Sequence, residues 1–104
     1  MISLVFAILF IQQPINDMSD WVHVGGQATY IFNDGELNGV GATGGNAFLH
    51  SPREYGDFVL ECDVKIAPGG NSGIQFRSHV RDNGRLFGYQ CEIDSSETWI
   101  CGAI

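Results

Sequence analysis

The sequence predicts an all-β, antiparallel fold for a single domain. Of its 104 residues 14 are Gly and 7 are Phe, and only 16% are charged, which fits a turn-rich sheet better than a helical protein. From Asp57 onward, apolar and polar residues alternate with the period of two that half-buried strands show. The dipeptide Asn83-Gly84, between two such stretches, is a strong hairpin signal. The length limits the chain to one domain.

The chain begins with an apolar run, Met1–Ile11. The run has the length of a signal-peptide core and is too short to cross a bilayer of ~30 Å as a helix. We therefore expect a signal-like segment and linker over residues 1–20, a domain over residues 21–104, and a secreted or periplasmic location. No Lys or Arg precedes the run and no small-residue cleavage site follows it. An uncleaved membrane anchor and a buried strand are therefore alternative interpretations of this run. Contact with a membrane is expected only if the run is an anchor.

The first hairpin is expected around Asn33-Asp34-Gly35, three residues that tolerate the backbone of a tight turn. Its strands are Ala28–Phe32 and Glu36–Val40. The loop that follows contains a formal G-x-G-x-x-G pattern, at Gly39, Gly41 and Gly44. Because no helix within a βαβ unit is indicated after it, this pattern predicts a loop and not a dinucleotide site.

Three further strands are predicted in the second half of the chain. Alternation covers Phe58–Ala67, then Ile74–Val80 after the turn Pro68-Gly69-Gly70-Asn71, and finally Leu86–Asp94. We expect a consecutive antiparallel meander. In that order the first and third strands lie two strand spacings apart, roughly 9 to 10 Å, which exceeds disulfide reach between Cys62 and Cys91.

Charge and cysteine content exclude several classes of function. The formal charge of −7, with only five Lys and Arg, disfavours binding to nucleic acid. A neutral or cationic partner suits this surface better. The odd count of cysteines, Cys62, Cys91 and Cys101, lacks the paired spacing of a zinc site and favours buried free thiols.

The predicted meander gathers polar residues on one side of its sheet. Glu92 and Asp94 lie two residues apart on one strand and therefore point the same way. Paired carboxylates are common in glycosidic chemistry. Spacing alone favours the simpler interpretation, a solvated sheet face. The full row consists of Glu61, Asp63, Lys65, Gln75, Arg77, His79, Gln90, Glu92 and Asp94.

Three other side chains have both a functional and a structural interpretation. Arg77 offers a donor fork for a sugar hydroxyl or an oxyanion, although the pattern favours pairing with Glu92 or Glu61. His79 has the pKa range of a general base, but a lone histidine near a strand end is more often incidental. Trp99, like Tyr55, is a candidate platform for stacking on a sugar ring.

Three blocks of the sequence form a recognisable pattern: residues 55–61 (YGDFVLE), 71–78 (NSGIQFRS) and 88–94 (GYQCEID). From about Trp21 to its end the chain resembles the 3-keto-disaccharide hydrolase domain, long classed as a domain of unknown function. The resemblance implies an antiparallel β-sandwich of the concanavalin A-like jelly-roll type. The last residues, Trp99–Ile104, form an apolar run with no turn signal, as in the middle of a strand. We therefore expect that jelly roll to be incomplete at the C-terminus.

The resemblance also implies a substrate, a disaccharide or glycoside oxidised to a ketone at C3. Removal of the acidified C2 proton would expel the glycosidic oxygen, and water would complete a net hydrolysis. Glu92 or Asp94 then fits the base and Arg77 the donor to the enolate oxygen. No cofactor is assigned, and a divalent metal with unidentified ligands is an alternative to Arg77. The other function considered is a lectin-like module without catalysis. Expected substrate-binding residues are Gln75, Gln90, Glu61, His79 and Trp99.

Overall fold

The computed structural model describes residues 15–41, 44–96 and 102, which contain strands and no helix. The strands pair as three two-stranded antiparallel sheets, β1–β4, β2–β3 and β5–β6. No described segment is therefore a helix of the length and apolarity that a membrane span requires. The six strands are β1 Val22–Gly25, β2 Ala28–Asn33, β3 Glu36–Gly41, β4 Ala47–His50, β5 Asn71–Val80 and β6 Leu86–Asp94.

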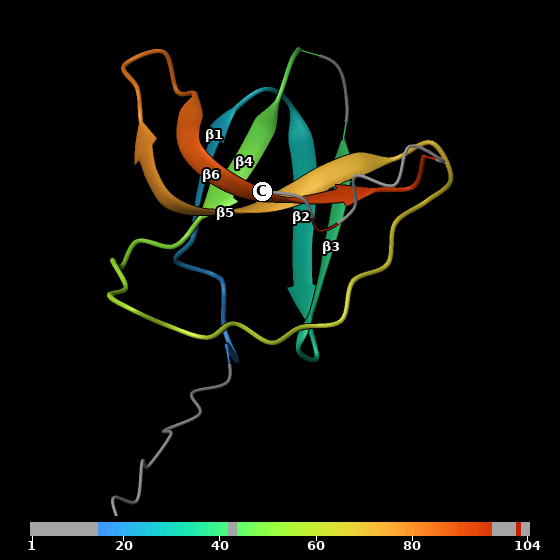
Figure 1. The fold of residues 1–104 in the computed structure, drawn as a ribbon, viewed down its shortest axis with the longest axis horizontal. Coiled ribbons are helices and arrows are strands. Elements are labelled where there is room, and N and C mark those ends of the chain that lie inside the picture. The colour runs from blue at the N-terminus through green and yellow to red at the C-terminus, as the bar shows by residue number, and fades with distance from the viewer. Residues whose placement is uncertain (1–14, 42–43, 97–101, 103–104) are drawn as a thin grey trace, which may run out of the picture.

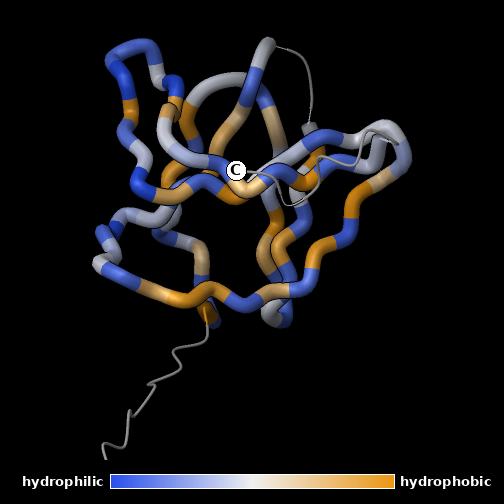
Figure 2. Tube along the Cα trace, in the orientation of Figure 1, coloured by the Kyte–Doolittle hydropathy of each residue, from blue (hydrophilic) through white to orange (hydrophobic). Residues whose placement is uncertain are grey.

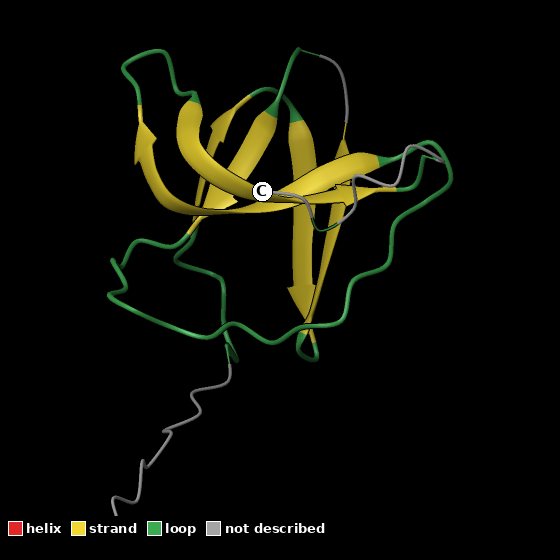
Figure 3. Cartoon of the chain, viewed as in Figure 1, coloured by secondary structure: helices red, strands yellow, loops and turns green. Residues whose placement is uncertain are grey.

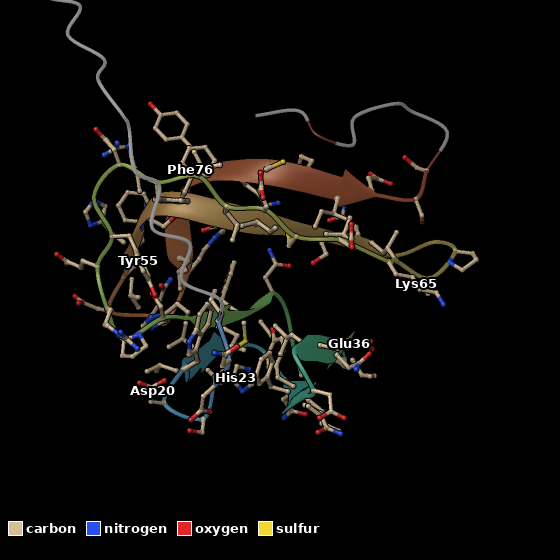
Figure 4. The ribbon with its side chains drawn as sticks, turned by 90° about the horizontal axis from the view of Figure 1, so that it is seen from below. Asp20, His23, Glu36, Tyr55, Lys65 and Phe76 are labelled. Atoms are coloured by element: carbon tan, nitrogen blue, oxygen red, sulfur yellow. The ribbon has the colours of Figure 1, made fainter. Side chains whose placement is uncertain are left out.

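The three sheets are arranged in two layers. The β5–β6 hairpin crosses in front of the other two sheets (Figure 1), and strands are the only regular structure drawn (Figure 3). Seen from below, β5–β6 lies above β1–β4 and β2–β3 (Figure 4). The predicted all-β, antiparallel class is confirmed, and the layers are consistent with a β-sandwich.

The predicted hairpin around Asn33-Asp34-Gly35 is confirmed as β2–β3. Asn33 pairs with Glu36, so Asp34 and Gly35 are the two central residues of the turn. Both have positive φ, 49° and 77°, which is the backbone of a type I′ turn. Alternate residues of β2 are half-buried while those between them are exposed, among them Ile31 at 60%. One face of this hairpin therefore packs inward.

The second predicted hairpin is confirmed as β5–β6. Its turn is closed by two backbone hydrogen bonds, from Arg81 N to Arg85 O and from Gly84 N to Arg81 O. Asn83 Oδ1 also accepts a hydrogen bond from Arg85 N at 3.1 Å. Before the turn, β5 contains a bulge between Phe76 and His79, where Arg77 has a φ of +49°. A bulge adds one residue to one strand and reverses its alternation.

The strand predicted over Phe58–Ala67 is wrong, and so is the three-strand meander. This segment pairs with none of the described strands and runs as an extended loop along the bottom of Figure 1. Its orange apolar positions stand at the edge of the molecule (Figure 2), with Val59 78% exposed and Val64 55%. Alternation alone does not make a strand, because each strand needs a neighbour for its backbone hydrogen bonds.

The core of the described part is small. Leu86, at the start of β6, is its only buried apolar side chain, at 9% exposure. Cys62 and Cys91 are free thiols, as expected. Cys62 is exposed, however, so its predicted burial is wrong because the strand that would bury it does not form. Cys101 lies outside the described residues.

Candidate functional site

Polar side chains on β5 and β6 form one hydrogen-bonded row, which we call the polar ladder: Ser78, Gln75, Gln90 and Glu92. Ser78 Oγ donates to Gln75 Oε1 at 3.3 Å. Gln75 Nε2 donates to Gln90 Oε1 at 3.0 Å, and Gln90 Nε2 donates to Glu92 Oε1 at 3.0 Å. All four residues are half-buried. The ladder thus aligns amides, a hydroxyl and a carboxylate in one direction.

Two glycines let the ladder lie close to the backbone. Gly73 is the cross-strand partner of Glu92, and a Cβ added at Gly73 would collide with the side chain of Gln90. A Cβ added at Gly88 would collide with Ser78 Oγ and would lie 2.8 Å from Ser78 Cα. A side chain at either position would therefore displace a ladder residue.

The bulge in β5 decides which side chains belong to the ladder. Gln75 pairs with Gln90, but His79 pairs with Phe87, which belongs to the opposite set of β6 residues. The His79 ring lies 5.6 Å from that of Phe87. The prediction that His79 shares a face with Gln75 is thus wrong, and Ser78 takes that place. Sequence alternation missed Ser78 because arginine carries no signal for the positive φ seen at Arg77.

Arg77 lies at the bulge and pairs with a residue that the sequence did not indicate. Its Nη2 bonds Asp57 Oδ1 at 2.8 Å, in place of the expected partners Glu92 and Glu61. Both side chains are open to solvent, at 65% and 97% exposure, so the pair contributes little to stability. Glu61 lies on the exposed segment 58–67 and forms no described bond to the ladder.

The two carboxylates near the end of β6 have different surroundings. Asp94 Oδ1 accepts a hydrogen bond from Ser96 N at 2.6 Å, and Asp94 Oδ2 accepts one from Asn71 Nδ2 at 3.3 Å. The bonds from Ser96, and secondarily from Asn71, lower the pKa of Asp94 below 3.8. Glu92 Oε1 accepts from Gln90, and within the described residues Glu92 Oε2 has no hydrogen-bond partner. Glu92 is therefore the better placed to accept a proton.

Asp94 should act as a stabilising cap of the β6 end. A carboxylate whose native pKa is lowered stabilises the fold above its unfolded pKa and loses that contribution as the pH falls through the native value. We expect Asp94→Asn to unfold at a lower temperature than the wild type at pH 7. The two melting curves should converge as the pH falls below about 3.8. Thermal denaturation between pH 7 and pH 2 tests this, and a constant difference across that range would contradict it.

The two aromatic candidates, Trp99 and Tyr55, have different outcomes. Trp99 lies outside the described residues, and Tyr55 packs edge-on against Phe58, with ring centroids 6.2 Å apart. In the described part of the chain no three His, Cys, Asp or Glu side chains gather as metal ligands would. The carboxylates at the end of β6 therefore do not form a cation site with a third described ligand.

Comparisons with known proteins identify a family. A family model described as "3-keto-alpha-glucoside-1,2-lyase-like domain" matches residues 13–104, which is most of the chain. No curated protein matches the sequence, and no solved structure does. The family match covers all six strands and the whole polar ladder.

Proposed function

Because this chain belongs to the 3-keto-alpha-glucoside-1,2-lyase-like domain family, we propose that it cleaves the glycosidic bond of 3-keto-disaccharides or 3-keto-glycosides. The observation that carries the proposal is the polar ladder, which ends at the carboxylate of Glu92. One oxygen of this carboxylate has no hydrogen-bond partner among the described residues. A 1,2-lyase breaks the C1–O and C2–H bonds, so the family description matches a reaction that begins with proton removal at C2.

In this proposal Glu92 is the base. Its carboxylate takes the proton from C2, and the electron pair moves onto the C3 ketone oxygen as an enolate. When that carbonyl re-forms, a double bond forms between C1 and C2 and the glycosidic oxygen leaves from C1. The leaving oxygen takes a proton from the now protonated Glu92 or from water. Water then adds at C1, a proton returns to C2, and the net result is hydrolysis.

The ladder amides are the donors available to the enolate oxygen. Gln75 and Gln90 each use one N–H of the amide within the ladder, which leaves a second N–H for the substrate. Neutral donors held in place by their neighbours stabilise developing negative charge at little cost of reorganisation. Arg77, the donor expected from the sequence, bonds Asp57 through Nη2 and has no described bond to the ladder.

The proposal is tested with a matched pair of substrates. A 3-keto-glycoside with a chromogenic leaving group should be cleaved, whereas the same glycoside without the ketone should not. The ketone is what acidifies the C2 hydrogen, so the unoxidised control has no proton that Glu92 can remove. Release of the leaving group from both compounds at equal rates would contradict the proposed chemistry.

A lectin-like module is the second candidate, and one observation favours it. Three of the four ladder residues carry hydroxyl or amide groups, which bind sugar hydroxyls without any chemical step. This candidate predicts binding of keto and unoxidised glycosides alike and no release of the leaving group from either. The same pair of compounds therefore separates the two functions.

A further inference from the structure

A cavity lies between the other two sheets, and no residue of the polar ladder lines it. It is a cavity of about 370 Å³, at the lower end of the range of small-molecule pockets. Its walls come from β1, β2, β3 and β4 and from the turn before β1, and they include no ladder residue. The lining consists of Asp17, Met18, Ser19, Trp21, His23, Ala28, Tyr30, Phe32, Leu37 and Leu49.

The position of one aromatic wall is fixed by a glycine. Tyr30 on β2 pairs with Gly39 on β3, and a Cβ added at Gly39 would lie 3.2 Å from Tyr30 Cε1. The tyrosine ring therefore takes the space next to Gly39 that a side chain there would need. His23 on β1 meets this ring edge-on, with centroids 5.4 Å apart and planes at 79°. Burial raises the pKa of Tyr30, as expected for a phenol at a partly enclosed surface.

Polar groups of different kinds stand beside these aromatic walls. Asp17 Oδ1 accepts a hydrogen bond from Ser19 N at 2.8 Å, and this bond lowers the pKa of Asp17. His23 Nε2 lies 2.9 Å from the carbonyl oxygen of Gly26. In the neutral ring Nε2 is then the donor, so Nδ1 is an acceptor. In Figure 4, His23 lies within the layer below β5–β6, between Asp20 and Glu36.

We infer that this cavity binds a neutral sugar ring, as a carbohydrate site separate from the polar ladder. A pyranose has apolar C–H faces that stack on aromatic rings and hydroxyls at its edge that need donors and acceptors. The Trp21 and Tyr30 rings supply the aromatic surface for stacking. The Asp17 carboxylate, Ser19 hydroxyl and His23 imidazole supply the donors and acceptors for the hydroxyls. An organic cation would need acceptors alone, whereas this lining also includes donors.

Binding of methyl glucoside to the full chain tests the inference, followed by calorimetry and by ligand-observed NMR. This sugar lacks the ketone, so its binding does not depend on the reaction at Glu92. Trp21→Ala should weaken binding by about tenfold or more, since it removes a stacking surface. The matched control is Tyr55→Ala, which removes an aromatic ring that is 57% exposed and outside the cavity. This control should bind like the wild type.

A second variant distinguishes loss of the binding site from loss of folding. Gly39→Ala keeps every lining side chain but crowds the Tyr30 ring, so it should weaken sugar binding while the circular dichroism spectrum stays unchanged. Gly73→Ala crowds Gln90 of the ladder as Gly39→Ala crowds Tyr30, so it should leave binding at the cavity intact and separates the two sites. Unchanged affinity in both Trp21→Ala and Gly39→Ala, or equal loss in Gly73→Ala, would overturn the inference. Displacement of the sugar by tetramethylammonium would also overturn it and indicate a cation site.

Discussion

Replacing Glu92 with glutamine is expected to lower turnover of a 3-keto-glycoside by roughly 10²–10⁴-fold, the usual contribution of a positioned base. The amide has nearly the shape of the carboxylate and accepts the same hydrogen bond from Gln90, so the polar ladder should remain in place. The loss should therefore appear in kcat, with little change in substrate affinity. Steady-state kinetics together with calorimetric binding of the unreacted substrate measure the two quantities separately.

The matched control is Glu61→Gln, the same chemical change at an exposed glutamate on segment 58–67. Its turnover should equal that of the wild type, because no described contact joins Glu61 to the ladder. Asp94→Asn should retain most activity at a temperature where it is folded, since both oxygens of Asp94 are engaged by Ser96 and Asn71. Full activity in Glu92→Gln, or loss of activity only in Asp94→Asn, would move the base away from Glu92.

The largest effect on stability is expected at Leu86. Leu86→Ala should lower the free energy of unfolding by about 2–5 kcal/mol, the range for truncating a buried leucine. Leu86 is the only buried apolar side chain in the described part of the chain, so its truncation removes the centre of the packing. Chemical denaturation followed by tryptophan fluorescence measures the difference.

Leu60→Ala is the control for this change, because it removes the same atoms from a side chain that is 46% exposed. Its effect should stay within about 0.5 kcal/mol of zero, as for most surface substitutions. Equal effects of the two substitutions would show that Leu86 is not the packing centre described here. A large effect at Leu60 alone would show that segment 58–67 is packed against another part of the protein.

The sequence predicted those parts of the fold that depend on neighbouring residues. Both hairpins follow from local turn chemistry, Asp34-Gly35 in one and Asn83-Gly84 in the other. The side chains of Gln75, Gln90 and Glu92 were correctly placed on one face, because the alternation of β6 is unbroken and β5 is regular up to Phe76.

The errors arise where the structure depends on distant partners. Segment 58–67 has a strand-like sequence, but its backbone finds no neighbouring strand in the described structure. The pairing of β1 with β4 joins segments about 25 residues apart and has no local signal. Likewise, a single bulge at Arg77 places Ser78 in the ladder where His79 was expected. No residue type at this position of the sequence indicates a bulge.

The most direct test of the central claim is the position of deuterium after cleavage of a 3-keto-glycoside in D₂O. Removal of the C2 proton by Glu92, followed by addition of water, predicts a released sugar that carries deuterium at C2. Incubation of the substrate and of the product without protein corrects for exchange next to the ketone. A product that keeps its original hydrogen at C2 would show direct displacement at C1, and would contradict the proposed role of Glu92 as the base.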